Sequence, residues 1–203
     1  MSNKVIALFA EGPTEVEFYK AVVIEARKLM GIPYSCEIEY VDMKGIGNYK
    51  KDALRKFNKL KQNHPNEEIF VFLCIDHDVF EFSKKPPFNK TELQKLLQDA
   101  GAKTVTYIVA KQSIEEWFLC DLDGVLSYLR LSKSTKRPKG NGQEALKKLF
   151  KMANKLYIKG SKTEGFIEKL NINKIIHSQC NVIKPICKSL NLDCKIICKK
   201  NIN

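Results

Sequence analysis

The sequence IFVFLCI at residues 69–75, followed by Asp76-His77-Asp78, decides the fold of this 203-residue chain. It is the most continuous apolar run in the sequence. A run without alternating polar residues is typical of a central strand in a parallel sheet that helices cover on both faces. We therefore predict a buried strand here, with two aspartates placed directly after it.

Strand and helix patterns alternate on both sides of this run. The first predicted helix is capped by Thr14, with Glu17 at its third position, and Gly31-Ile32-Pro33 ends it. Strands and helices that alternate through right-handed crossovers form a parallel, doubly wound sheet. We predict an α/β fold with a four-stranded parallel sheet and helices on both faces. The expected strands are 4–10, 35–41, 69–75 and 105–110, and the expected helices between them are 14–30, 49–62 and 91–100.

The chain beyond this sheet has a weakly helical pattern. A short helix is expected at residues 113–120, and residues 132–142 (SKSTKRPKGNG) are expected to form a flexible basic loop. We predict two units, a catalytic α/β domain at residues 1–125 and a basic, mainly helical extension at residues 126–203. Residues 191–203 fit no single element, and the further helices are expected at 143–156, 163–170 and 180–190.

The net charge of +12 is concentrated in the last third of the chain. Residues 1–129 carry 17 Lys and Arg against 19 Asp and Glu, a net charge of −2, whereas residues 130–203 carry 18 against 4, a net charge of +14. A basic region favours a polyanion partner, because neutralising phosphates releases their condensed counterions. A lysine-rich solvated surface has the same composition, so charge alone leaves both interpretations open.

The cysteines and the lack of a long apolar run indicate the compartment. The seven cysteines are an odd number, and three of them lie within apolar patterns, which suits reduced thiols better than a disulfide framework. No apolar run is long enough to cross a membrane, and the N-terminus leads into a strand pattern without a cleavage site. We expect a cytoplasmic protein without a membrane partner.

Four carboxylates are expected at one edge of the sheet. Glu11 follows the first strand, Glu15 lies in the first turn of the next helix, and Asp76 and Asp78 follow the third strand. Ligands of α/β proteins collect at the carboxyl ends of the strands. Clustered carboxylates repel one another unless a hard cation lies among them, and oxygen ligands suit Mg²⁺ or Mn²⁺. Each pair also has a structural explanation, as a turn, a helix cap or a residue that the helix dipole favours.

Two short motifs carry a resemblance to a known family. Glu11-Gly12-Pro13-Thr14-Glu15 after one strand and Asp76-His77-Asp78 after a later one resemble the paired signature of the Toprim domain. This Rossmann-like metal-binding fold occurs in topoisomerases, bacterial primases and small nucleases. The Thr14-Glu15 form and residues 113–119 (SIEEWFL) are similar to the OLD-like and RloB-like branch, which is associated with bacterial anti-phage defence. The resemblance covers roughly residues 4–120, in the correct order.

The resemblance implies roles for the acidic residues. It makes Glu11 a metal ligand or general acid–base, Asp76 and Asp78 metal ligands, and Glu15 a residue that orients or completes the site. Metal ions in such sites polarise a phosphodiester, activate a water and stabilise the leaving oxygen. Glu115, an acidic residue before the tryptophan as in that branch, is a further candidate. The chain has no Walker glycine loop, so an OLD-type ATPase would be a separate chain.

Other residues near the expected site each have two interpretations. Lys111 follows the fourth strand on the same edge, where an ammonium would stabilise the charge of a phosphoryl transition state, or it is a surface lysine. Trp117, the only tryptophan, is interpreted as core packing rather than as a base-stacking platform. Ser113 and Glu116 are expected to form a capping box at the start of a helix.

The basic loop at residues 132–142 is the expected phosphate-binding element. Lys133, Lys136, Arg137 and Lys139 would contact nucleic acid, although disordered linkers have the same composition. The three histidines, at positions 64, 77 and 177, have no metal-ligand spacing, so histidine chemistry is not expected.

The sequence thus predicts a Mg²⁺- or Mn²⁺-dependent Toprim nuclease that hydrolyses phosphodiester bonds of DNA or RNA, as the effector of a bacterial defence system with a separate ATPase subunit. The alternative is a catalytically silent nucleic-acid- or protein-binding module of a defence complex. A nucleotidyl-transfer enzyme such as a primase or topoisomerase fragment is disfavoured, because no candidate nucleophilic tyrosine is expected beside the site and the chain is short for either. The substrate and the oligomeric state are left open, a homo-oligomer included.

Overall fold

The sheet has four strands, and all of them are parallel. The strands lie in the order β2-β1-β3-β4, with Val5 paired to Ile69 on one side of β1 and to Glu37 on the other. The predicted α/β fold with a four-stranded parallel sheet is confirmed. The strands are β1 (Lys4–Ala10), β2 (Glu37–Asp42), β3 (Glu68–Asp76) and β4 (Thr104–Ala110). This computed structural model describes residues 4–30, 36–81, 84–159, 161 and 163–192.

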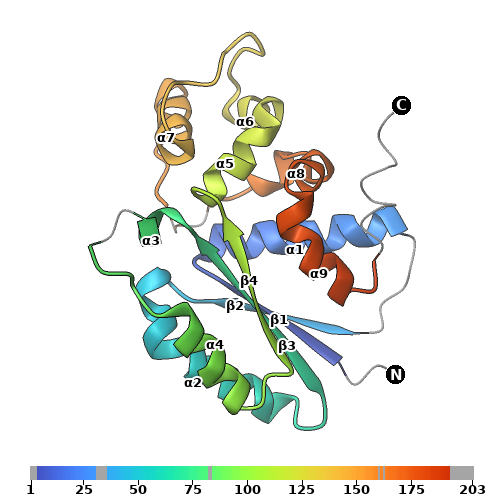
Figure 1. Cartoon of the computed structure of the whole chain (residues 1–203). Helices are drawn as coiled ribbons and strands as arrows, with labels where there is room; N and C mark the ends of the chain where they lie inside the picture. Colours follow the sequence, from blue (N-terminus) through green and yellow to red (C-terminus); the bar gives the residue numbers. More distant parts are fainter. Residues whose placement is uncertain (1–3, 31–35, 82–83, 160, 162, 193–203) are drawn as a thin grey trace.

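Strand β1 separates two hydrophobic cores. Its Ile6 and Leu8 belong to one cluster of buried residues, whereas Val5 and Phe9 belong to another, because side chains alternate between the two faces of a strand. Helices therefore cover both faces, as predicted (Figure 1). The Val5 face is covered by α2 (Tyr49–Asn63) and α4 (Lys90–Asp99), and the Ile6 face by α1 (Pro13–Met30), α8 (Ile172–Ser178) and α9 (Cys180–Ser189).

Short helices gather beyond the carboxyl ends of β3 and β4 (Figure 1). One of them, α7, packs against α5, and a Cβ on Gly142 would lie 2.6 Å from the Glu116 backbone nitrogen. Glycine therefore permits this close approach. The helices at this end are α3 (Asp78–Glu81), α5 (Ile114–Phe118), α6 (Leu122–Leu129) and α7 (Gly142–Met152), and the three 3-10 turns of the described chain are η1 (Ile46–Asn48), η2 (Leu119–Asp121) and η3 (Ile167–Lys169).

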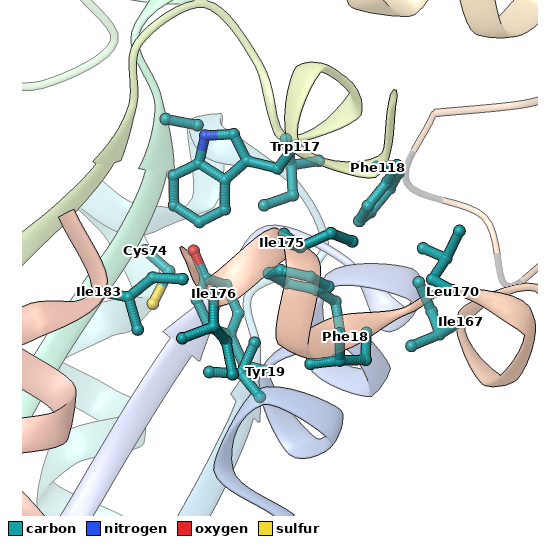
Figure 2. Packing of buried hydrophobic residues seen from close by; sticks show 14 of the residues in the cluster. Phe18, Tyr19, Cys74, Trp117, Phe118, Ile167, Leu170, Ile175, Ile176 and Ile183 are labelled. Atoms are coloured by element: carbon teal, nitrogen blue, oxygen red, sulfur yellow. The ribbon is translucent and has the colours of Figure 1, made fainter. Parts of the chain in front are cut away.

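Trp117 lies in the core between the first helix and the C-terminal helices. It is buried, and its ring centroid lies 6.0 Å from that of Phe18. Figure 2 shows Ile176 of α8 and Ile183 of α9 in the same group of buried side chains, with Ile183 drawn beside Cys74. The prediction that Trp117 packs in the core is confirmed. The predicted catalytic domain ends at residue 125, which lies inside α6. One continuous hydrophobic cluster contains residues from both sides of this position.

The C-terminal helices differ from the sequence-based prediction. Residues 163–170 form only the turn η3, because Gly165 adopts a left-handed conformation with φ +68° that interrupts a helix. Helix α7 ends at Met152 rather than at residue 156, and Asn154, with φ +53°, lies just beyond it. Helices α6 and α8 were not predicted. In α8 the isoleucines have modest helix propensity, so core packing of Ile175 and Ile176 decides the structure.

Two parts of the prediction lie outside the described residues. The first is the stretch that contains the helix stop at Gly31-Ile32-Pro33 and the start of the strand expected at residue 35. The second is most of the unassigned segment 191–203. Within the described residues, the helices are too short or too polar to cross a membrane.

Candidate metal centre

Glu11 and Asp76 meet at the carboxyl ends of two adjacent strands. Glu11 follows β1 and Asp76 ends β3, and these strands pair side by side in the sheet. The Asp76 backbone N–H donates a hydrogen bond of 3.0 Å to Glu11 Oε1. The two residues are only 6% and 3% exposed. The order of the strands therefore brings two carboxylates that are 65 residues apart into one buried site.

Glu15 turns back toward the strand from the first turn of α1. Its Oε2 accepts hydrogen bonds from the backbone N–H groups of Glu11 at 2.6 Å and Gly12 at 3.2 Å. One ligand atom from each of Glu11, Glu15 and Asp76 lies within 4.8 Å of the other two. Oxygen atoms at this spacing can share one hard cation.

Thr14 does not cap α1 as predicted. It lies inside the helix, its hydroxyl donates to the Ser161 carbonyl at 2.6 Å, and it accepts from the Thr163 N–H at 3.3 Å. These bonds fasten the segment after α7 to the start of α1. The threonine therefore connects the acidic end of the sheet to the basic third of the chain.

Asp76 also caps helix α5. Its Oδ1 accepts from the Ile114 N–H at 2.8 Å, whereas the Ser113 side chain makes no capping hydrogen bond. The predicted capping box is therefore wrong, because a carboxylate from β3 takes the place of the serine hydroxyl and Glu116 pairs with Arg137 instead. A carboxylate at this N-terminus gains from the exposed N–H groups and from the helix dipole.

Asp78 lies at the border of the site, two residues beyond the end of β3. Its Oδ1 accepts from the Val79 N–H at 2.7 Å, and its side chain is 30% exposed. It is not one of the three carboxylates that lie within 4.8 Å of one another. Asp78 is linked to them through Lys159, whose ammonium lies 3.8 Å from Asp78 Oδ2.

Lys159 provides an ammonium to the site. Its Nζ lies 2.6 Å from Asp76 Oδ2, and the side chain is 23% exposed. Burial lowers the pKa of this lysine, but Asp76, Glu115 and Asp78 outweigh burial and raise its pKa, which keeps it charged. Lys111, the lysine that the sequence suggested, is exposed and forms no hydrogen bond or ion pair with the described residues. No local pattern distinguishes Lys159 from its many neighbouring lysines.

Glu115 is fully buried beside these residues. The Tyr157 hydroxyl donates to its Oε1 at 3.0 Å, while its Oε2 has no hydrogen-bond partner among the described residues. Tyr157 was missed by the sequence-based prediction, which placed no tyrosine near the motifs. Burial and then the charge of Glu115 raise the pKa of Tyr157, so its phenol stays protonated and is a poor nucleophile.

The electrostatics of this site are unbalanced. We call Glu11, Glu15, Asp76, Asp78 and Glu115 the acidic cluster. Burial is the largest cause that raises the pKa of Glu11 and of Glu15, and it raises the pKa of Asp76 to about 8 against the opposing effect of Lys159. In the described part of the chain, the Lys159 ammonium pairs with Asp76 and Asp78 and also interacts electrostatically with Glu11, Glu15 and Glu115. A cation among them would stabilise their charged forms.

The basic loop at residues 132–142 makes no direct bond between its four predicted basic residues and the acidic cluster in the described chain. Lys133, Lys136, Arg137 and Lys139 are exposed, as nucleic-acid contacts would require. Arg137 donates to Glu116 Oε1 at 2.9 Å, which attaches the loop to α5. None of the four forms a hydrogen bond or ion pair with a carboxylate of the acidic cluster, as far as the structure describes the chain.

A second group of potential ligands lies at the start of the edge strand β2, where Glu37 pairs with Val5 and Glu39 with Ala7 of β1. His64 is isolated in sequence, but its Nε2 lies 3.2 Å from Glu39 Oε1 and its Nδ1 lies 3.7 Å from Glu37 Oε2. We call these three residues the His64 group. Their ligand atoms also lie within 4.8 Å of one another.

Comparison of the chain with protein-family models, with curated proteins and with solved structures finds no match. The donors of the acidic cluster are carboxylate oxygens, which favour a hard divalent cation over zinc. The unpartnered Glu115 Oε2 and the excess of buried carboxyl groups fit such a cation.

Proposed function

We propose that the chain is a Mg²⁺- or Mn²⁺-dependent nuclease that hydrolyses phosphodiester bonds of DNA or RNA. One observation carries the proposal: Glu11, Glu15 and Asp76 come from two adjacent strand ends and the helix between them, and their ligand atoms lie within 4.8 Å of one another. The Toprim-like motifs, with Glu11 after β1 and Asp76-His77-Asp78 after β3, have the same arrangement. The proposal extends to a role in bacterial defence with a separate ATPase subunit.

Glu11, Glu15 and Asp76 would hold the metal, with Asp78 and Glu115 completing the site. The bound metal would polarise the phosphodiester and acidify an attacking water. The fold prepares these ligands: the Glu11 and Gly12 N–H groups orient Glu15, and the Asp76 N–H orients Glu11. Ligands that are already oriented need little rearrangement when a metal binds.

Lys159 would act on the substrate rather than on the metal. Its ammonium lies 2.6 Å from Asp76 and borders Asp78, so it stands where a phosphate would approach these carboxylates. A fixed positive charge at this place would stabilise the negative charge that develops on a phosphoryl group. Lys159 thus takes the role that the sequence suggested for Lys111.

One observation favours the silent binding module instead. Most oxygens of the cluster already have partners within the chain: Asp76 caps α5 and pairs with Lys159, and Glu15 accepts two N–H groups. Carboxylates satisfied in this way stabilise the protein without chemistry. In that case nucleic acid or protein would bind with no metal requirement.

The test combines metal binding with cleavage. Purified protein is incubated with plasmid, single-stranded DNA and total RNA in Mg²⁺, Mn²⁺ or EDTA, and Mn²⁺ binding is measured by calorimetry. Asp76→Asn retains an acceptor for the Ile114 N–H but loses the charge, so we expect no Mn²⁺ binding and a cleavage rate at least about 100-fold lower. Glu39→Gln, which removes a carboxylate of the His64 group, serves as the matched control and should behave as the wild type.

Equal cleavage by the wild type and Asp76→Asn would exclude the proposed site. Failure of the wild type to bind Mn²⁺ would exclude it as well, whether or not an activating partner is missing. Nucleic-acid binding that is the same in Mg²⁺ and in EDTA, without Mn²⁺ binding, would support the silent module.

A further inference from the structure

A basic groove runs along α7 to the acidic cluster. It has a volume of about 510 Å³ and is lined by Lys147, Lys151, Lys155 and Lys159, together with apolar side chains. At one end of this groove Tyr157 bonds to Glu115 and Lys159 bonds to Asp76. The groove therefore ends on the carboxylates that the proposed function uses.

The lysines of the groove form a row. Lys147 and Lys151 are separated by four residues on α7, which places them on one face of the helix about 6 Å apart along its axis. Lys155 continues the row after the helix ends, and Lys159 terminates it. Lys147, Lys151 and Lys155 are exposed, and the Lys155 ammonium lies 4.4 Å from the centre of the Tyr128 ring. Such a row is complementary to a chain of regularly spaced negative charges.

Apolar side chains lie exposed beside these lysines. Leu156 is 78% exposed, Ile158 is 53% exposed, and Met152 on α7 is 55% exposed. Three of the five exposed large apolar side chains in the described residues thus lie within seven consecutive positions. A duplex hides the faces of its bases, whereas a single strand presents them to apolar groups.

We propose that this groove binds a single nucleic-acid strand and guides its backbone to the acidic cluster. The proposal rests on the nuclease function and specifies its substrate: lysines 147, 151 and 155 contact successive phosphates, while Leu156 and Ile158 contact unpaired bases. Lys159 receives the phosphate nearest the metal site. The row of lysines matches a polyanion that leads to a site for phosphodiester hydrolysis, which an acidic protein or a lipid surface does not explain.

The experiment measures binding apart from cleavage. A fluorescently labelled oligothymidine, and its duplex with oligoadenosine, are titrated with the full chain in EDTA at several salt concentrations, and fluorescence anisotropy reports binding. The groove variant replaces Lys147, Lys151 and Lys155 with Gln, a residue of similar helix propensity. The matched control replaces Lys50, Lys51 and Lys59, which are exposed on α2 at the other face of the sheet, and so makes the same change in net charge.

The groove variant should bind the single strand at least about tenfold more weakly at low salt. Each lost phosphate contact reduces the slope of log affinity against log salt by about 0.7, so three contacts reduce it by about 2. Leu156→Ser with Ile158→Ser should weaken single-strand binding several-fold and leave duplex binding within about twofold. The α2 control should match the wild type. Circular dichroism of each variant confirms that it folds.

Three results would overturn the groove proposal. They are equal weakening by the groove variant and the α2 control, tighter binding of the duplex than of the single strand, and competition by polyglutamate or anionic lipid vesicles as strong as by oligothymidine at equal charge. The proposed nuclease function has a separate readout, because Asp76→Asn should bind the strand in EDTA but not cleave it in Mg²⁺. If the wild type cleaves nucleic acid but the groove variant binds the strand as tightly as the wild type, the nuclease function stands and the groove proposal is rejected.

Discussion

The acidic cluster and the His64 group look alike by distance and differ in charge and burial. Each contains three residues whose potential ligand atoms lie within 4.8 Å of one another. In the His64 group, each ring nitrogen faces its own carboxylate, and the Glu37 side chain is 63% exposed. In the acidic cluster, Glu11, Glu15 and Asp76 are all buried. Water can solvate Glu37, but it cannot reach the three buried carboxylates equally well.

This difference is the reason that we propose a cation for the acidic cluster and none for the His64 group. The two carboxylates of the His64 group each face a ring nitrogen and are also open to solvent, since Glu37 is 63% exposed and Glu39 33% exposed. Burial raises the pKa of Glu11, Glu15 and Asp76, so their ionised forms need more positive charge than Lys159 supplies, and Glu115 Oε2 lacks a partner among the described residues. Proximity of potential ligands is therefore a weaker criterion for a metal centre than uncompensated burial.

The largest expected effect separates the two groups by activity. Glu11→Gln retains the acceptor for the Asp76 N–H but loses the charge that would hold the metal. We expect metal-dependent cleavage to fall at least about 100-fold. His64→Gln should change cleavage less than about twofold, because no carboxylate of the acidic cluster depends on it. A steady-state cleavage assay in Mg²⁺ compares the two, and a larger loss in His64→Gln would reverse the assignment.

The charge imbalance itself is tested by Lys159→Met. Removing the ammonium leaves the buried Asp76 unpaired, and we expect the free energy of unfolding in EDTA to fall by about 2–3 kcal/mol. Lys103→Met is the matched control, since Lys103 also lies 2.6 Å from its partner Glu68, but both side chains are more than half exposed. That change should cost about 0–1 kcal/mol.

Denaturant unfolding measures both variants. Added Mn²⁺ should restore more stability to Lys159→Met than to the wild type, because the variant has more uncompensated charge. Equal losses for the two lysines would mean that Lys159 does not balance the buried carboxylates.

The carboxylates of this site could be predicted from the sequence, whereas Lys159 and Tyr157 could not. Glu11 and Asp76 follow apolar strands, and the topology of a parallel sheet places their ends at one edge. Glu15 is placed near them because it lies in the first turn of the helix that starts directly after β1. Lys159 and Tyr157 come from irregular chain after α7, and Lys159 is 83 residues from Asp76. The packing of α7 on α5 and the hydrogen bonds of Thr14 to Ser161 and Thr163 bring that segment to the sheet edge.

The same limit explains the errors in secondary structure. The strands were predicted from apolar runs such as residues 69–75 and from the alternation of polar and apolar residues at 35–41. Helix α8 was missed because its seven residues contain too few turns for a clear period, and the core around Trp117 stabilises them. Local patterns therefore suffice for the sheet and for residues at its strand ends, but not for contacts that tertiary packing creates.

The acidic cluster and the His64 group should also differ in how they make stability depend on pH. The pKa of Asp76 is raised by burial to about 8, whereas an unfolded aspartate has a pKa of about 3.9. Between these values the folded state binds more protons than the unfolded state, so stability falls as the pH rises from about 4 to 8. In EDTA, Asp76→Asn should flatten this fall, and Glu39→Gln should retain it. Thermal unfolding measured across this range tests both, and an unchanged slope in Asp76→Asn would contradict the raised pKa.

The smallest expected effect concerns the unpartnered oxygen that distinguishes the acidic cluster. Tyr157→Phe removes the only hydroxyl that the described residues donate to Glu115, which leaves a fully buried carboxyl group without a hydrogen bond. Tyr107→Phe removes a hydroxyl that donates to the Lys90 carbonyl at 2.8 Å in a half-buried position. We expect the first change to cost about 1–3 kcal/mol and the second about 0.5–1.5 kcal/mol, since an acceptor left buried loses its solvation as well as its bond.

Urea unfolding in EDTA and in Mn²⁺ measures both tyrosine variants. If Glu115 contributes to a cation site, Mn²⁺ should reduce the cost of Tyr157→Phe, because a bound cation compensates the carboxylate that the phenol no longer contacts. The cost of Tyr107→Phe should be the same in both conditions. Equal costs for the two variants in EDTA would mean that Glu115 has another partner. Its free oxygen would then no longer separate this cluster from the His64 group, and burial alone would have to carry that distinction.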